Sequence, residues 1–266
     1  MILVKIGGGE SINIEAVIAD LADLASIDAR FIIVHGANVL RDQLAEKLGM
    51  GKTILTSVSG YSSVFSDQDA IDLIMMSYAG LRNKRIVELC QRSDINAVGL
   101  TGLDGRIVQG ERNKGIRVRE NGKILIKRDF SGKPRSINIE LLRLLIDNNY
   151  CPVMTIPIVD EQGFAINSEN DDIVAKIANA LEIDTVIQLI EAPGFLDDPD
   201  DENSLVERMN LAELTEREAQ VEGRIKRKLL ALTRLCAGGK TRVIISDGRG
   251  EHPVADALDG RGTHIQ

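Results

Sequence analysis

Tryptophan is missing from this sequence, and aromatic residues make up 3% of its 266 residues. Proteins that bind single-stranded nucleic acid depend on aromatic side chains on which the bases stack. The formal net charge of −8 and the pI near 5.1 also oppose binding to a polyanion. General nucleic-acid binding is therefore not expected.

Cysteine and histidine are also scarce. Cys90, Cys151 and Cys236 stand alone, and an odd number without Cys-x-x-Cys spacing gives little support for a disulfide framework or a zinc site. The three histidines have no ligand spacing, so we expect no metal-binding side chains of that kind. The sequence has no basic leader and no long apolar run. We expect a cytoplasmic protein that does not enter a membrane.

Short aliphatic runs, by contrast, are frequent, and they alternate with segments of helical periodicity. This alternation is typical of a parallel sheet covered by helices on both faces. We therefore predict an α/β fold, a three-layer αβα sandwich with a mainly parallel central sheet. The predicted strands cover residues 2–6, 31–34, 97–100, 151–156, 185–189 and 243–245.

The pattern changes between residues 106 and 135. The segments 106–110, 116–119 and 124–127 have the period of two that is typical of strands, and Glu120-Asn121-Gly122-Lys123 is a strong hairpin turn. We predict antiparallel hairpins appended to the parallel sheet. No linker-like segment divides the chain, so we expect one domain, residues 1–266, with two lobes that meet near residue 165.

The first candidate site is the end of the first predicted strand, Lys5-Ile6-Gly7-Gly8-Gly9. Glycines let the backbone approach an anion and direct N–H groups at it, and a helix expected over residues 12–28 adds a favourable dipole. Lys5 would then face an anion such as a phosphate. A tight strand-to-helix turn with a lysine at the strand end explains these residues equally well.

The second predicted strand also ends in a turn of small residues, His35-Gly36-Ala37-Asn38, before a helix expected over residues 39–48. The ends of parallel strands lie at one edge of the sheet, so both turns can face one ligand. We favour a hydrogen-bonded, structural His35 over a catalytic base. For Thr101-Gly102-Leu103-Asp104-Gly105 we favour a tight turn over a loop that lines the site.

Residues 166–172 are rich in polar side chains just before an apolar helix. One helix N-cap needs one such residue, and this stretch holds five amides or carboxylates. Asn167 could therefore bind a substrate carbonyl or carboxylate, and Asp171 could orient lysines. A capping role is the alternative.

Two further stretches are candidates. Residues 223–228 place four cations near a predicted helix N-terminus, where the dipole favours an anion, and Lys228 lies nearest to the aliphatic run. A solvated charged face is the alternative explanation. The loop at Glu191, Pro193 and Gly194 follows a predicted strand and could flank an adenine or a ribose, although alone it is only a turn.

Together these segments resemble the amino acid kinase superfamily over nearly the whole chain. The sequence is most similar to its acetylglutamate kinase branch and, more narrowly, to kinases of lysine and arginine biosynthesis that phosphorylate aminoadipate or glutamate attached to the small acidic carrier protein LysW. The motifs that carry the resemblance are Lys5-Ile6-Gly7-Gly8, His35-Gly36, residues 99–105, Asn167 to Asp171, Pro193-Gly194 and the helix of Lys228. The narrower match rests on residues 7–13, 83–89, 129–132, 223–228 and 246–249.

The resemblance implies transfer of the γ-phosphoryl group of ATP, with Mg²⁺, to a side-chain carboxylate, giving an acyl phosphate. It implies an acceptor-substrate lobe over residues 1–165 and a nucleotide-binding lobe over residues 166–266. It implies that Lys5 and Lys228 stabilise the phosphoryl groups and that Asp171 orients both lysines. The implied substrate-binding residues are Gly8, Gly36 and Ala37, which would offer backbone N–H groups to the reacting carboxylate and phosphoryl oxygens, together with Val64 and Asn167. The implied nucleotide-binding residues are Gly7, Glu191, Pro193, Gly194, Arg224 and Lys226.

The sequence departs from the family pattern at the substrate end. Ala37 stands in a turn that the family builds from glycine and serine, and Glu169-Asn170-Asp171 replaces an Asn-Ala-Asp or Asp-Gly-Asp turn. Val64 stands where an arginine grips the substrate's α-carboxylate, and valine offers no such contact. Either another cation binds the α-carboxylate, or the substrate differs at that end.

The predicted hairpins are strongly basic. Residues 106–135 contain ten Lys and Arg against three Asp and Glu, a local excess of seven positive charges in a chain whose net charge is −8. A solvated edge hairpin is one explanation. A docking patch for an acidic carrier protein is the other, because such a partner would be steered to it.

The chain begins at its first predicted strand, without the N-terminal helix that joins dimers into hexamers in arginine-inhibited relatives, so we expect a homodimer. Two alternative functions stay open. One is a kinase for free N-acetylglutamate. The other is a nucleotide- or carrier-binding subunit without turnover, which the residues at Ala37 and Val64 leave possible.

Overall fold

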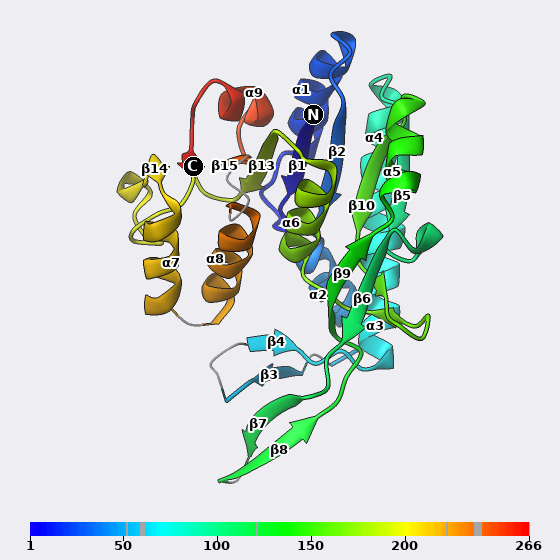
Figure 1. The fold of residues 1–266 in the computed structure, drawn as a ribbon, viewed down its shortest axis with the longest axis vertical. Coiled ribbons are helices and arrows are strands. Elements are labelled where there is room, and N and C mark those ends of the chain that lie inside the picture. Colours follow the sequence, from blue (N-terminus) through cyan, green and yellow to red (C-terminus); the bar gives the residue numbers. More distant parts are fainter. Residues whose placement is uncertain (52, 59–61, 121, 222, 237–240, 266) are drawn as a thin grey trace.

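One eight-stranded sheet runs through the middle of the molecule (Figure 1). The computed structural model describes the chain except residues 52, 59–61, 121, 222, 237–240 and 266, and it describes residues 62, 63, 120, 223–225 and 227 by their backbone alone. The strand order is β14-β16-β15-β13-β1-β2-β10-β5, and neighbours are parallel except β15 and β16. These strands are β1 (Ile2–Ile6), β2 (Phe31–His35), β5 (Ala97–Thr101), β10 (Cys151–Thr155), β13 (Thr185–Ile190), β14 (Arg208–Met209), β15 (Arg242–Asp247) and β16 (Thr263–Ile265). The six predicted strands and the mainly parallel sheet are confirmed.

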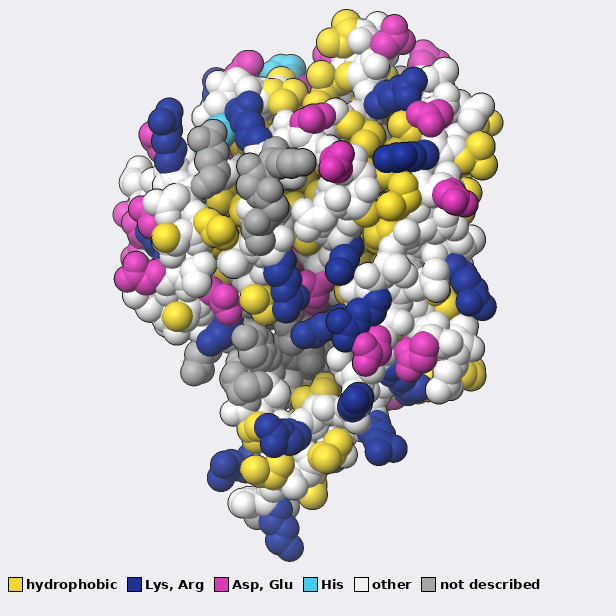
Figure 2. All heavy atoms as spheres, in the orientation of Figure 1, with side chains coloured by type: hydrophobic (Ala, Val, Ile, Leu, Met, Phe, Trp, Pro, Cys, Tyr) yellow, Lys and Arg dark blue, Asp and Glu magenta, His cyan; other side chains and the backbone are white. Residues whose placement is uncertain are grey.

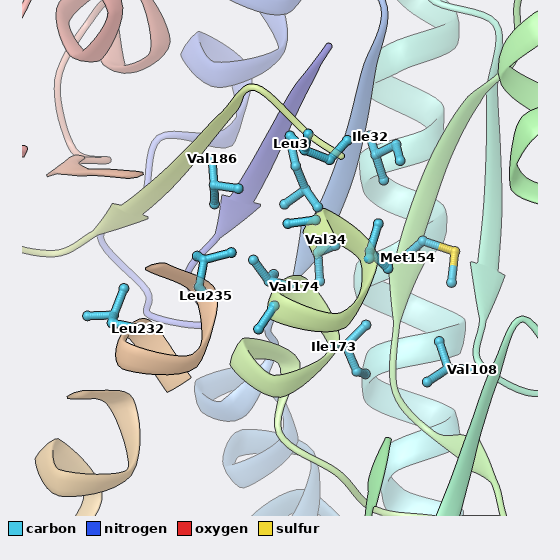
Figure 3. Close-up of a cluster of buried hydrophobic side chains, with 14 of the residues drawn as sticks. Leu3, Ile32, Val34, Val108, Met154, Ile173, Val174, Val186, Leu232 and Leu235 are labelled. Atoms are coloured by element: carbon cyan, nitrogen blue, oxygen red, sulfur yellow. The ribbon is translucent and has the colours of Figure 1, made fainter. Parts of the chain in front are cut away.

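Helices cover both faces of this sheet. Side chains alternate along each strand, so Leu3 and Val34 enter one buried layer (Figure 3), whereas Val4 and Ile33 enter the other. The first layer is closed by α3 (Gln68–Ile74), α5 (Ile139–Asp147), α6 (Asn170–Leu181), α7 (Leu211–Gln220) and α8 (Gly223–Cys236). The second is closed by α1 (Ile14–Ser26), α4 (Asn83–Arg92) and α9 (Pro253–Leu258). The predicted three-layer sandwich is therefore confirmed.

One long helical segment contains a π-helix between two α-helices. The α3 helix continues into a π-helix, Met75–Arg82, which continues into α4. π-Helical turns are rare and are frequent at functional sites. The remaining helix, α2 (Asn38–Lys47), begins directly after β2, one residue before the predicted start. No helix in the described part of the chain has both the length and the apolar character required to span a bilayer.

Smaller antiparallel elements lie below the main sheet in Figure 1. A four-stranded sheet has the order β12-β11-β6-β9 and is antiparallel except between β11 and β6, which are parallel, and two antiparallel hairpins pair β3 with β4 and β7 with β8. Their bounds are β3 (Ile54–Thr56), β4 (Ser62–Val64), β6 (Val108–Arg112), β7 (Ile116–Glu120), β8 (Lys123–Lys127), β9 (Gly132–Ile137), β11 (Ile158–Val159) and β12 (Ala165–Ile166). The predicted antiparallel hairpins are confirmed.

The first predicted hairpin strand starts two residues later than expected. Asp104–Arg106 form a 3₁₀ turn instead, in which Gly105 has φ +54° and Arg106 has φ +50°. This left-handed backbone ends strand geometry and favours glycine. The strand therefore begins only at Val108.

Candidate active site

A buried ion pair lies at the carboxyl end of the central strand. Lys5 occupies the same face of β1 as Leu3, the face covered by α6, and it is 7% exposed. Its Nζ lies 2.7 Å from Oδ1 of Asp171, the second residue of α6. Burying either charge alone would be costly, so each requires the other. Two residues far apart in the sequence are thus held together by the packing of α6 on the sheet.

A second lysine acts on the same carboxylate. Burial raises the pKa of Asp171, but the charges of Lys5 and Lys228 outweigh that effect and lower its pKa below the usual value. Asp171 is therefore ionised at neutral pH. Lys228 lies on α8, which packs against α6, and its side chain is exposed. The structure thus brings together the three predicted catalytic residues.

The start of α6 contains polar groups that the fold leaves unsatisfied. Its N-cap residue, Glu169, makes no side-chain capping bond. Ser168 Oγ and Asn170 Oδ1 are buried and lack a hydrogen-bond partner among the described residues. Buried polar atoms without partners are rare in native proteins. Side-chain capping at Glu169 therefore does not explain the polar residues 166–172, and these two atoms have no partner in the described part of the chain.

The two small-residue turns are packed backbone to backbone. A Cβ on Gly8 would lie 2.8 Å from Ala37 N and 2.7 Å from Asn38 N, and a Cβ on Gly36 would lie 2.9 Å from Gly8 N. Neither position tolerates a side chain. Ala37 is the N-cap of α2 and makes no side-chain capping bond, so the helix N-terminus faces Gly8 with its backbone nitrogens and with the Asn38 side chain, whose Oδ1 would clash with a Cβ on Gly8. This arrangement suits an anion.

Two backbone N–H groups of these turns are already in use. Gly7 N donates to Leu189 O at 3.0 Å, and Gly36 N donates to Ile6 O at 2.9 Å. Both bonds continue the ladder of the parallel sheet for one residue beyond the strands. The expectation that Gly36 offers its N–H to the reacting groups is therefore wrong, and its role is to permit close approach. Asn38, whose Oδ1 lies over Gly8, was not predicted.

His35 is a structural residue, as predicted. Its ring is fully buried, with Nε2 3.1 Å from Asn83 Nδ2 and Nδ1 3.3 Å from Gly36 O. Burial lowers its pKa to about 3, so the ring is neutral at physiological pH. A group with that pKa is poorly matched to general base catalysis near neutrality. Asn83, at the end of the π-helix, was not predicted as its partner.

The third turn is also structural. Thr101 donates from both N and Oγ1 to Asp104 Oδ2, at 2.7 and 2.8 Å. These bonds close the turn on itself, which confirms the predicted tight turn. Leu103 and Pro157 help to line a hollow of about 300 Å³ there, and neither Lys5 nor Asp171 is among its described lining residues.

Asn167 is held in place by residues that the prediction missed. Its Nδ2 donates to Ser66 Oγ at 3.0 Å, and Ser66 Oγ donates to Val64 O at 3.3 Å. Val64 therefore lies near Asn167 through its backbone, at the end of β4. Ser66 N in turn donates to the buried carboxylate of Asp129. Asp129 lies in one of the motifs of the narrower match, residues 129–132, but its partner Ser66 is 63 positions away, so the sequence alone did not connect the two residues.

The predicted nucleotide-binding residues are spread over two places. Glu191 Oε1 accepts from Ser11 N at 2.7 Å, beside Gly9 in the loop after β1. Gly194 packs against Thr263 of β16, and Pro193 lines a hollow of about 1080 Å³ beside β15 and β16. Lys226 is half-buried on α8, whereas the side chain of Arg224 lies outside the described residues.

The described residues fit a magnesium nucleotide better than a metal alone. Lys5, Lys228 and the uncapped start of α2 would hold phosphate oxygens. No group of three or more His, Cys, Asp or Glu that could hold a metal occurs among the described residues. Mg²⁺ commonly keeps its waters and binds through phosphates with one or two carboxylates. Asp171 is the carboxylate paired with Lys5.

Comparison with known proteins identifies the family of this chain. Residues 1–247 match the model of the amino acid kinase family. The chain is 38% identical over 269 residues to a [LysW]-aminoadipate kinase of Thermus thermophilus, with both chains fully covered. It is 28% identical over 273 residues to an acetylglutamate kinase of Archaeoglobus fulgidus, covering 99% of this chain and 92% of the relative.

A solved structure shows the same fold. Carbamate kinase from Giardia lamblia bound to AMP-PNP aligns with a TM-score of 0.69 at 15% sequence identity, over 99% of this chain and 97% of that chain.

Proposed function

This chain belongs to the amino acid kinase family, and we propose that it phosphorylates the side-chain carboxylate of aminoadipate or glutamate carried by the acidic protein LysW. The product would be an acyl phosphate. ATP would supply the phosphoryl group and Mg²⁺ would neutralise part of its charge. The observation that carries the proposal is the buried Lys5–Asp171 pair with Lys228 acting on the same carboxylate.

Charge stabilisation is the main task in such a transfer, because the phosphoryl group needs little covalent help. Lys5 is fixed by Asp171, so its ammonium stabilises developing charge without first reorganising. Lys228 lies on a different helix and would neutralise the departing side of the phosphates. Asp171 keeps both cations oriented while remaining ionised, since its pKa is lowered.

Backbone groups would position the acceptor carboxylate. Gly8 and Ala37 would direct their N–H groups at it, because their backbones lie in close contact next to the N-terminus of α2, with the Asn38 side chain beside them. Holding the two reacting oxygens in that position converts a bimolecular step into a nearly unimolecular one. Asn167, oriented by Ser66, would contact the far end of the acceptor. Val64 leaves that end without the expected guanidinium.

Recognition of the carrier would fall to the β7–β8 hairpin. Figure 2 shows Lys and Arg side chains gathered on the part of the molecule where this hairpin projects. Arg117, Arg119 and Lys123 are exposed there, together with Ile124 and Ile126, which are 53% and 63% exposed. A surface that is both basic and apolar suits an acidic protein better than a free amino acid.

The proposal also covers the division into lobes, the oligomeric state and the cellular compartment. Residues 1–165 would form the acceptor lobe and residues 166–266 the nucleotide lobe, on either side of the junction between β1 and β13. A homodimer is supported by the exposed Met76 and Leu81 of the π-helix, which lies beside the edge strand β5. A reducing compartment, the cytoplasm, is supported by three free cysteines, all of them buried.

The test is to trap the product. Purified protein is incubated with ATP, Mg²⁺ and hydroxylamine, and with either LysW-linked aminoadipate, LysW-linked glutamate or free N-acetylglutamate. We expect a hydroxamate from a carrier-linked acceptor at a much higher kcat/KM. Turnover of N-acetylglutamate alone would establish the kinase for the free amino acid instead. Binding of ATP without hydroxamate from any acceptor would indicate a subunit without turnover.

A further inference from the structure

A buried carboxylate lies at the base of the basic hairpin. Asp129 follows β8 and is 3% exposed. Its Oδ1 accepts from Ser131 N at 3.2 Å and from Ser131 Oγ at 2.6 Å, and its Oδ2 accepts from Ser66 N at 3.1 Å. Hydrogen bonds to an ionised carboxylate are stronger than those between neutral groups. One side chain thus joins the end of the hairpin to the segment that follows β4, 63 residues earlier in the chain.

The same segments are joined by their backbones. Phe130 N donates to Ser66 O at 2.7 Å, Asn167 N donates to Phe130 O at 2.7 Å, and Gly132 N donates to Asn167 O at 2.9 Å. Ser66 Oγ accepts from the Asn167 side chain. The hairpin base, the segment after β4 and the Asn167 turn are therefore one continuous hydrogen-bonded unit.

The other stem of the hairpin enters this unit through Arg112 and Asn113. Arg112 Nε donates to Asp129 O at 2.8 Å, and its guanidinium lies over the Phe130 ring, 4.0 Å from the centroid. Asn113 Nδ2 donates to Ser131 Oγ at 2.8 Å. Both stems are thus clamped at the point where the strands of the hairpin separate. A two-stranded ribbon has little stability of its own, so its orientation depends on this clamp.

We propose that Asp129 is a positioning residue that couples the basic β7–β8 hairpin to Asn167 and Ser66 in the acceptor pocket. The inference rests on the proposed function, since it assigns the hairpin to an acidic carrier. A carrier bound to the hairpin shifts or stiffens its stems, and Asp129 carries this change to Ser66 N. Ser66 then orients the Asn167 amide, which contacts the acceptor.

An extended network of this kind transmits motion because its bonds are directional and largely shielded from water. Ser66 is fully buried and Asp129 nearly so, and a hydrogen bond in such surroundings is stronger than one in water. When the acceptor is linked to a carrier, docking of the carrier on the hairpin would orient Ser66 and Asn167 before the acceptor binds. A free amino acid does not contact the hairpin, so it would bind without this prior orientation.

The substitution Asp129→Asn tests the coupling. An amide has one accepting oxygen, so its NH₂ group must face either Ser66 N or the Ser131 donors, and one of the two links is lost. The matched control is Asp20→Asn. Asp20 is 5% exposed and likewise accepts from two backbone N–H groups, those of Val254 and Ala255, far from the hairpin. Ser131→Ala is the milder variant if Asp129→Asn does not fold.

Amide hydrogen exchange with unloaded LysW gives a readout that is independent of turnover. In the unsubstituted protein we expect slower exchange in β7–β8 and also in residues 64–67 and 165–169. In Asp129→Asn we expect the hairpin to stay protected while the protection of the other two segments is lost. Kinetics with LysW-linked aminoadipate should show kcat about 10- to 100-fold lower with KM for the carrier within twofold. In Asp20→Asn we expect the exchange protection and the kinetic constants of the unsubstituted protein.

Three results would overturn the inference, and the first is distinguishable from the other two. If the carrier protects no part of β7–β8 in the unsubstituted protein, the proposed function fails and this inference fails with it. If the hairpin is protected in both proteins and the protection spreads equally to residues 64–67, Asp129 carries no coupling. A rise in KM with unchanged kcat would have the same meaning, because it would make Asp129 part of the docking surface.

Discussion

The transfer centre around Lys5 and the β7–β8 hairpin are built in opposite ways. Lys5 lies at the end of the central strand of an eight-stranded sheet and is nearly buried, whereas the hairpin has two strands and exposed side chains. The first is supported by hydrophobic layers on both faces of the sheet. The second is held by a bridge from Ser57 to Val118 and by the bonds around Asp129. On the proposed function, chemistry would take place in the part supported by the sheet, and recognition in a part that can change with little cost to the fold.

Breaking the central ion pair should have the largest effect. Lys5→Met removes the cation and leaves Asp171 buried without its partner. We expect kcat to fall by about 10²- to 10³-fold, and the free energy of unfolding to fall by about 3–5 kcal/mol. Steady-state kinetics and urea unfolding measure the two losses.

The double variant Lys5→Met/Asp171→Leu separates these losses. It removes both charges, so most of the stability should return while activity stays lost. If activity also returned, the lysine would act only through folding. That outcome would contradict the proposed transfer centre.

Separating the Gly8 turn from the Ala37-Asn38 turn should have the second-largest effect on activity. Gly8→Ala places a methyl group 2.7–2.8 Å from Ala37 N and Asn38 N, so the turns must separate. We expect kcat/KM about 10²-fold lower, because the N–H groups move from the acceptor position. In the control Gly51→Ala the added methyl meets nothing within 4 Å, and activity should be unchanged. Equal activity in both variants would show that the turns do not hold the acceptor.

Charge reversal on the hairpin should act on recognition alone. In Arg117→Glu/Arg119→Glu we expect the KM for LysW-linked acceptor to rise about tenfold with kcat nearly constant, because exposed charges mainly alter association. The dependence of kcat/KM on salt should weaken as well. The control Arg143→Glu changes an exposed cation on α5 and should leave both quantities unaltered. A fall in kcat without a change in KM would place the hairpin in the chemistry instead.

The smallest effect concerns pH and His35. Its pKa in the folded state is about 3, below the usual 6.5, so the unfolded chain binds a proton that the folded protein excludes. The imidazole should therefore lower stability progressively as pH falls from about 6.5 towards 3, with a slope of at most about 1.4 kcal/mol per pH unit. His35→Gln should show a shallower slope in urea unfolding between pH 6.5 and 5. An unchanged slope would mean that His35 is protonated in the folded protein.

Much of the transfer centre could be predicted from local pattern. Lys5 stands near the end of β1, Asp171 at the start of α6 and Lys228 within the first two turns of α8, and a parallel sheet brings strand ends and the helix starts that follow them to one edge. The N–H of Gly36 was mispredicted, because a turn sequence does not show whether the ladder extends one residue further. The side chain of Arg224 lies outside the described residues.

The sequence by itself determined the order of strands and helices, the glycine turns, the basic hairpin and the family. These features depend on neighbours in the chain: periodicity, backbone freedom at glycine, and the number of charges in a segment. Only the tertiary structure decided that Asp171 meets Lys5 across the packing of α6, and that Asp129, Ser66 and Asn167 form one unit. Those contacts join residues up to 166 positions apart (Lys5 and Asp171). A buried polar side chain needs a hydrogen-bond partner, and which residue becomes that partner depends on the packing of distant segments.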